Sequence, residues 1–278
     1  MKKMKLLTLS LTAFLAVNLN ALSLDEAVSI ALKNNFEIQG KNYDYLESLE
    51  NINSVNSNNL PKLDAVYGFT NTDKPNIGYE SDEAVASIAL SYNLFNGFKD
   101  ISLKESSKYL SLSSQHGLNA TKQDIVLNTK TAYINYLDKK NALETYNSAY
   151  ILFQEQYEDS KHRYEQGLIA KNDLLQVQVN MSNAKQNVVK AQGDLKISSF
   201  TLSNILGGMD LSKEKIEDLD EKSLQSFTYN EELLENRSEI QALLLNLKSI
   251  KELEKSTNSG YYPKIDATVS HNKYFDEL

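Results

Sequence analysis

The chain has 278 residues, a charged fraction of 24% and a formal net charge of −8, and this length allows one large domain or two ordinary ones. No basic run follows the first five residues, which argues against nucleic acid as a partner because phosphate binding needs clustered Lys and Arg. The absence of cysteine excludes disulfides, and the presence of only three prolines leaves room for very long helices.

The N-terminus has the parts of a secretory signal peptide. A basic start, "MKKMK", precedes the apolar run "LLTLSLTAFLAV", and the small residue Ala21 follows shortly after. This run is too short to span a membrane stably, so we expect residues 1–21 to be a signal peptide that is cut after Ala21. No later stretch is apolar over about eighteen residues, so membrane insertion would have to use β-strands.

Residues 24–60 are predicted to form a long helix. Ser23 and Glu26 have the spacing of a capping box, and apolar residues then recur with a helical period. Pro61 cannot continue this helix, and it pushes the residue before it toward an extended conformation.

Two predicted strands, 63–72 and 84–95, follow and are joined by a polar loop rich in turn residues. Each strand alternates between an apolar face and a small or polar face, and each has about the length that a tilted strand needs to cross a bilayer. An ordinary half-buried hairpin in a soluble sheet would alternate in the same way, and the strands alone favour this simpler alternative.

Residues 103–206 predict a long antiparallel helical hairpin, because apolar residues repeat every seven positions on both sides of a break at Gly167. Seams this narrow do not make a globular core, so the hairpin is either a rod-like coiled coil or one hairpin in a larger ring. The seams of the first helix include Thr129, Tyr136 and Leu143, and Ile125, Ala132 and Lys139. Those of the second helix are Leu174, Met181, Val188, Leu195 and Leu202, and Val177, Ala184, Ala191, Ser198 and Ile205.

A short phrase occurs twice in the chain. "PKLDA" at Pro61 recurs as "PKIDA" at Pro263, and "EIQ" recurs at the same offset of 202 residues. Duplication at a fixed period indicates a repeated structural unit. We therefore assign 22–225 to a first helix–strand–strand–helix–helix repeat, which closes with an acidic linker at 209–225, and 226–278 to the start of a second repeat.

The order of these elements resembles the TolC family of outer membrane efflux proteins, also called outer membrane factors. "LSLDEAVSIALKNNFEIQ" is similar to the opening helix of the family, "LPKLDA" to its entry into the first strand and "LSYNLFNGF" to the end of its second strand. "RYEQGLIAKNDLLQVQVNMSNAK" resembles the hairpin-tip signature, and "LSNILGG" resembles its close. Together these motifs cover the chain after the signal peptide.

The resemblance implies a mainly α fold with a β-hairpin, in which a long antiparallel helical hairpin forms part of a periplasmic α-barrel and the strands join an outer membrane β-barrel. It implies a passive homotrimeric conduit for efflux or type I secretion, located in the outer membrane with its helical part in the periplasm. Its partners would be outer membrane lipid, a periplasmic adaptor and an inner-membrane pump. Neither catalysis nor a cofactor is expected.

The resemblance also implies two sets of site residues. One set lies at the hairpin tip and would meet the adaptor, although a simple chain turn would explain the same glycine. The other set lies on the strands and would face lipid. The tip residues are Arg163, Tyr164, Gly167, Leu168, Ile169 and Ala170. The strand residues are Tyr67, Phe69, Ile88, Leu90, Tyr92 and Leu94.

The chain departs from the family pattern in its second repeat, which is incomplete. It offers three strands, and a lone third strand would leave an unpaired edge facing lipid, where each unsatisfied backbone group is costly. We therefore expect a truncated or split member of the family, and no gate residue is assigned.

Three alternatives compete with a functional channel. A soluble periplasmic or surface coiled-coil protein with a structural or binding role would have the same long helices. A truncated family member without function would have all the sequence features described above. An enzyme is the weakest alternative, because His116, His162 and His271 lack metal-ligand spacing, and neither a phosphate loop nor a nucleophile elbow is present.

Overall fold

The computed structural model describes residues 21–71, 82–219 and 232–275. The fold is mainly helical with one small antiparallel sheet, as predicted. In the part of the chain that the structure describes, no helix combines the length and the apolar character needed to cross a membrane. The predicted signal peptide lies outside the described residues, except for Ala21.

The chain divides into two compact units. The hairpin unit contains the described residues before Leu32 and those from 128 to 219, and the sheet unit contains the remaining described residues. Helix α3 (Lys99–Glu165) is continuous and contributes residues to both units. It begins four residues earlier than predicted, directly after a turn at Gly97 and Phe98 that both have positive φ.

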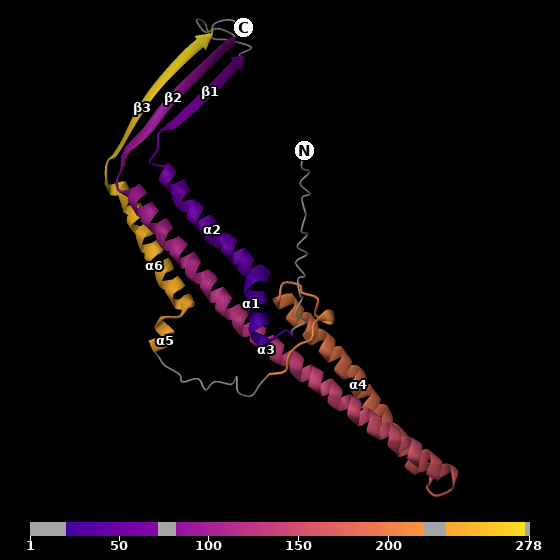
Figure 1. Ribbon diagram of the computed structural model, residues 1–278. Coiled ribbons are helices and arrows are strands. Elements are labelled where there is room, and N and C mark those ends of the chain that lie inside the picture. Colours follow the sequence, from indigo (N-terminus) through magenta and orange to yellow (C-terminus); the bar gives the residue numbers. More distant parts are fainter. Residues whose placement is uncertain (1–20, 72–81, 220–231, 276–278) are drawn as a thin grey trace, which may run out of the picture. The chain divides into compact units, whose positions relative to one another are not determined.

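The hairpin unit is built on the second part of α3 and on α4 (Lys171–Ile205), which run side by side in opposite directions (Figure 1). Every residue of α4 that is buried belongs to one of the two predicted seams, so the heptad prediction is confirmed for this helix. These buried residues are Ala184, Val188, Ala191, Ser198 and Leu202.

The hairpin unit has a second layer at the end of α4, where the chain returns through the short 3₁₀ helix η1 (Leu211–Lys213). Leu22, which precedes helix α1 (Leu24–Asn34), pairs there with Ile216 in a parallel β-bridge. Both side chains are about 5% exposed. The predicted linker at 209–225 is therefore not a free connection over its first part.

The predicted single helix over 24–60 is divided at Asn35 and ends at Ser57. Asn35 has an extended backbone, and its side chain accepts hydrogen bonds from the N–H groups of Glu37 and Ile38. It thus caps a new helix, α2 (Phe36–Ser57), which explains the break because asparagine satisfies helix-start N–H groups better than it continues a helix.

The helices of the sheet unit pack through small polar residues. Helix α2 and helix α6 (Ser238–Thr257) both lie along the first part of α3 (Figure 1), and α6 follows the single-turn helix α5 (Glu232–Glu235). Buried and half-buried serine hydroxyls join these helices. The contacts are Ser48 to Ser111 at 3.2 Å, Ser106 to Ser249 at 2.9 Å, and Ser113 to the carbonyl of Ala242 at 2.7 Å.

The sheet has the order β1-β2-β3 and is antiparallel throughout. Strand β1 is Lys62–Asn71, β2 is Asp82–Asn96, and β3 is Lys264–Phe275, which follows the short 3₁₀ helix η3 (Asn258–Tyr261). The sheet has the three strands that the sequence predicted, and β3 is an edge strand. Strand β3 pairs with β2 along almost its whole length, with one bulge between Asn93 and Phe95.

Elements recur at the offset seen in the sequence. Helix α2 begins at 36 and α6 at 238, and β1 begins at 62 and β3 at 264, so both pairs of starts lie 202 residues apart. The helix–strand order of the first repeat is thus repeated in space as well as in sequence.

Candidate functional site

The hairpin tip is a Schellman turn that ends α3. The N–H of Gly167 donates to the carbonyl of Tyr164, and the N–H of Leu168 donates to the carbonyl of Arg163, each at 2.9 Å. Gly167 has a φ of 71°, the left-handed conformation that this turn requires and that glycine adopts without steric cost. The backbone thus explains the glycine, independently of any partner.

The start of α4 completes the tip. The N–H of Ala170 donates to a carboxylate oxygen of Asp173 at 3.3 Å, and the N–H of Asp173 donates to the carbonyl of Ala170 at 3.1 Å. This reciprocal contact holds the loop of only five residues, 166–170, against the first turn of α4.

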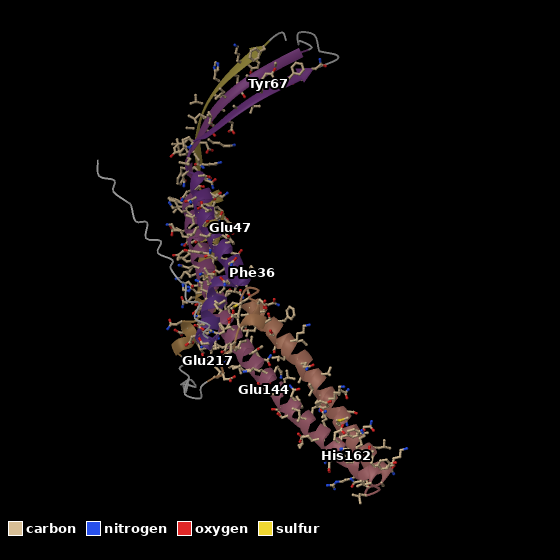
Figure 2. The ribbon with its side chains drawn as sticks, turned by 45° about the vertical axis from the view of Figure 1, so that its right-hand side comes forward. Phe36, Glu47, Tyr67, Glu144, His162 and Glu217 are labelled. Atoms are coloured by element: carbon tan, nitrogen blue, oxygen red, sulfur yellow. The ribbon has the colours of Figure 1, made fainter. Side chains whose placement is uncertain are left out.

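The side chains of the tip leave an apolar surface in solvent. Leu168 is 68% exposed and Tyr164 is 39% exposed. The Arg163 guanidinium lies 3.0 Å from the Asp159 carboxylate, and both groups are well exposed, so this ion pair adds little to stability. Figure 2 shows this end of the hairpin near His162, with its side chains pointing outward. Such a surface suits a contact with another protein.

The second candidate site is one face of the sheet. The register places Leu63 opposite Leu90, Ala65 opposite Ile88, and Tyr67 opposite Ala86. Because side chains alternate along a strand, the predicted residues of β1 and β2 share one face, with Leu94 at the bulge. Their exposed fractions are 61% for Tyr67, 54% for Phe69, 57% for Ile88, 47% for Leu90, 39% for Tyr92 and 59% for Leu94.

Strand β3 continues this apolar face and brings two ionisable groups to it. Val269 pairs with Leu90 and is 74% exposed. His271 pairs with Ile88, and Lys273 pairs with Ala86. The Lys273 ammonium lies 5.1 Å from the centre of the Phe275 ring, close enough for a cation–π contact.

The opposite face of the sheet is more polar, although Gly68, Val85 and Tyr274 form a largely apolar row across it. Asp64, Ala89 and Ser270 form one row across it. Lys62, Ser91 and Thr268 form the next row, and Val66, Ser87 and Asn272 form another. The sheet therefore separates an apolar face from a face of mainly polar and small residues.

An aromatic cluster lies where the sheet meets the helices. The rings of Phe95 and Phe98 stack edge to face with centres 5.1 Å apart, and those of Phe98 and Tyr262 do so at 5.5 Å. Gly97 makes this contact possible, because a Cβ atom there would lie 2.6 Å from the carbonyl oxygen of Ser259. Tyr261 beside the cluster is 89% exposed.

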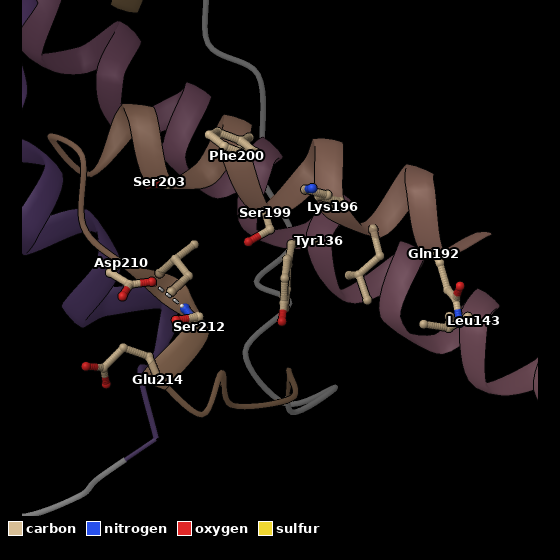
Figure 3. Close-up of a pocket in the computed structure, with 12 residues that line it drawn as sticks. Tyr136, Leu143, Gln192, Lys196, Ser199, Phe200, Ser203, Asp210, Ser212 and Glu214 are labelled. Carbon is tan, nitrogen blue, oxygen red and sulfur yellow. Dashed lines mark hydrogen bonds between the residues drawn. The ribbon is translucent and has the colours of Figure 1, made fainter. Parts of the chain in front are cut away.

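The hairpin unit also contains an open cavity of about 560 Å³ between α3, α4 and the segment around η1 (Figure 3). Aromatic and aliphatic side chains such as Tyr136, Leu195 and Phe200 line it, together with Lys196 and Glu214. No sequence pattern indicates this cavity, because its walls come from residues 136–143 and 192–214, which are far apart in the chain. Within the described ranges, no group of three or more His, Cys, Asp or Glu side chains is placed to hold a metal ion.

Sequence reasoning missed Tyr133, which is fully buried in the hairpin unit. Its hydroxyl lies 2.8 Å from the carbonyl oxygen of Leu22 and 2.6 Å from that of Glu217. Burial, followed by the nearby carboxylates of Glu217 and Asp218, raises the pKa of Tyr133 to about 12. No sequence pattern could have found it, since Tyr133 lies outside the heptad seams and its partners are backbone atoms of distant segments.

The model of the outer membrane efflux protein family matches residues 27–208, well over half of the chain. The chain therefore belongs to the outer membrane efflux protein family, which consists of channels and not of enzymes.

The chain is similar in sequence to outer membrane protein TolC from two bacteria. The chain is 26% identical to TolC of Escherichia coli over 271 residues, which are 95% of this chain and 54% of that protein. It is 26% identical to TolC of Vibrio cholerae over 231 residues, which are 81% of this chain and 52% of that protein. The chain thus spans about half the length of the curated relatives that it matches.

Solved structures share the fold. The CmeC outer membrane channel of Campylobacter jejuni superposes with a TM-score of 0.75 at 18% identity, covering 92% of this chain and 61% of that one. CusC gives a TM-score of 0.74 at 17% identity, covering 92% of this chain and 60% of that one.

Proposed function

We propose that the chain is a subunit of an outer membrane export channel. Three copies surround a passive conduit, with the three-stranded sheet in the outer membrane and the helices in the periplasm. The conduit works in tripartite efflux or type I secretion, together with a periplasmic adaptor and an inner-membrane pump. Family membership and the similarity to TolC support this proposal.

The uncovered apolar face of the sheet is the observation that carries the proposal. Leu63, Tyr67 and Val269 are each more than 60% exposed, although in a soluble sheet one apolar face is normally packed on a core. Lipid against this face and water against the polar face would satisfy both sides, as in the wall of a membrane channel.

The register adds a second, independent support. The neighbour of Tyr67 across β2 on β3 is Lys273, whereas its counterpart in the repeat is Val269. The residue that lies across from Tyr67 on β3 is therefore four positions further along the chain than the residue that corresponds to Tyr67 in the second repeat. Strands that tilt relative to the axis of a closed barrel need a stagger of this kind. It places equivalent residues of the two repeats at the same height along that axis.

The absence of cysteine from the chain makes the lipid contact directly testable. In cells that express Ile88→Cys or Ser87→Cys, the two cysteines would lie on adjacent residues but on opposite faces of the sheet. We expect Ile88→Cys to react with a lipid-confined maleimide and Ser87→Cys with a water-soluble one. Equal reaction of both with the water-soluble reagent would refute the proposal.

Fractionation distinguishes the competing class of protein. Extraction of the chain from the outer membrane only by detergent supports the channel, and a cross-linked species of three copies supports the trimer. Release with the soluble periplasmic contents would instead support a coiled-coil protein with a structural or binding role.

The adaptor contact is the proposed role of the hairpin tip. Leu168→Glu places a charge on the exposed tip, where the native side chain is 68% exposed, so folding should be unaffected. We expect co-purification with the adaptor to fall at least about tenfold, the equivalent of 1.4 kcal/mol. Ile151→Glu changes an exposed residue of α3 away from the tip and should leave binding unchanged. Equal binding by both variants would place the adaptor contact elsewhere.

A further inference from the structure

Leu22 is buried, and both of its backbone polar groups form hydrogen bonds. Its N–H donates to the carbonyl of Lys215 at 2.6 Å, and its carbonyl accepts from the N–H of Glu217 at 3.0 Å. The Tyr133 hydroxyl lies 2.8 Å from the same carbonyl oxygen. Its side chain is 5% exposed and belongs to the core of the hairpin unit. Both backbone polar groups of Leu22 are therefore used by the fold.

Leu22 is also the residue that a cut after Ala21 would place first in the processed chain. Such a cut replaces one amide N–H by an ammonium group with three donors and a positive charge. The position of this nitrogen is already determined, because it lies against the Lys215 carbonyl and beside a bridge to Ile216. A buried cation is costly unless nearby groups stabilise it.

The surroundings of Leu22 are acidic. The carboxylates of Glu217, Asp218 and Glu26 are near enough to act electrostatically on the Tyr133 hydroxyl, which itself contacts Leu22. The ion pair of Lys140 with Asp218, at 3.3 Å, offsets only one of these negative charges, and its Asp218 side chain is 73% exposed. An ammonium at Leu22 would therefore enter a region of negative potential.

We propose that the processed N-terminus at Leu22 is a structural group of the hairpin unit, bound by the Lys215 carbonyl and stabilised by the carboxylates of Glu26, Glu217 and Asp218. Removal of the signal peptide then does more than release the chain, because it supplies a charge that completes the fold. This inference goes beyond the proposed channel function and does not depend on it.

Three forms of the processed chain test the inference. The first starts at Leu22, the second keeps Ala21 as one added residue, and the third starts at Leu22 but is acetylated on its amine. All three keep the side chains of the fold, so a difference between them reports the amine. We expect the first form to melt at least about 2 °C above the other two, and its amine to react with an acetylating reagent at pH 7 at least about tenfold more slowly than that of the second form.

The pH dependence has a defined sign. An amine whose pKa is raised on folding stabilises the folded state below its ordinary value, which is about 8, and this contribution is lost as pH rises through the folded value. The advantage of the first form should thus be full at pH 6 and absent at high pH. The charged and titratable groups around the amine are Glu26 of α1, Tyr133 and Lys140 of α3, and Lys215, Glu217 and Asp218 of the segment after η1.

Charge-only variants provide the matched control. Glu217→Gln and Asp218→Asn keep the backbone contacts of Leu22, and they should reduce the difference between the first and second forms. Equal melting of the three forms, with ordinary reactivity of the amine, would overturn the proposal. Mass spectrometry of the chain processed in cells should give an N-terminus at Leu22, and a mature chain that begins elsewhere would overturn it as well.

Discussion

Tyr133→Phe isolates the contribution of one buried hydroxyl. The hydroxyl lies within hydrogen-bond distance of the carbonyls of Leu22 and Glu217, whereas the ring fills the core. Removing it should cost about 1–2 kcal/mol, because a hydrogen bond is lost and one carbonyl loses its donor. The Leu22 carbonyl keeps its bond from the N–H of Glu217, which limits the loss. Tyr133→Ala also removes the ring and should cost about 3–5 kcal/mol.

Hydrogen exchange measured by mass spectrometry reads this loss locally. The amides of Leu22 and Glu217 both donate across the bridge that Tyr133 secures, so their protection should fall about tenfold for each 1.4 kcal/mol. The protection of amides near the hairpin tip should fall less, because local opening at the tip does not require the bridge between Leu22 and Ile216 to break. Unchanged protection in Tyr133→Phe, with a clear loss in Tyr133→Ala, would show that the hydroxyl contributes nothing and would refute the reasoning.

The same variant has a predicted pH dependence. Burial and the neighbouring carboxylates raise the pKa of Tyr133 from 10.0 to about 12. Between these values the unfolded chain releases a proton that the folded chain retains, so the free energy of unfolding falls as pH rises. Phenylalanine cannot ionise, and the deficit of Tyr133→Phe relative to the native chain should therefore shrink from pH 10 to pH 12 in denaturant titrations.

Identical substitutions should have opposite effects at different glycines. Gly167→Ala forces a Cβ into the left-handed conformation and should cost about 1–2 kcal/mol, whereas Gly193→Ala, inside α4 with open space around it, should stabilise by about 1 kcal/mol; urea midpoints decide both. Gly97→Ala should lower the melting temperature most, because the new Cβ would meet a backbone oxygen at 2.6 Å. For the hydroxyl pair of Ser106 and Ser249, each Ala variant should cost about 1 kcal/mol, and the double variant less than the sum; strict additivity in a double-mutant cycle would argue against a coupled pair.

Local signals in the sequence were enough to predict most elements of the fold. A change from helical to alternating periodicity at Pro61 predicted the strands, and the heptads predicted the buried residues of α4. The break at Asn35 was missed because its cap competes with a periodic pattern that continues through it. The hairpin tip was predicted from a motif, and its Schellman geometry follows from Gly167.

Contacts between distant segments were not predictable from these signals. The pairing of β3 with β2 depends on a register between strands that are more than 160 residues apart. Tyr133 and the Leu22 bridge involve backbone atoms, which carry no residue identity. The repeat predicted that a strand would begin near Lys264, but it could not predict which neighbour that strand would take.

Helix α6 of the sheet unit inverts the usual rule that apolar residues lie inside. The residues of α6 that are buried are Ser238, Ser249 and Ser256, while Leu243 and Ile250 on the same helix are 68% and 54% exposed. Small side chains let helix axes approach closely, and their hydroxyls can hydrogen-bond across the contact. The leucines then remain on the outer surface of the layer, where a lone chain has nothing to bury them. Such a layer is unfavourable for an isolated protein but is suited to a subunit whose neighbours in a proposed ring of helices cover that surface.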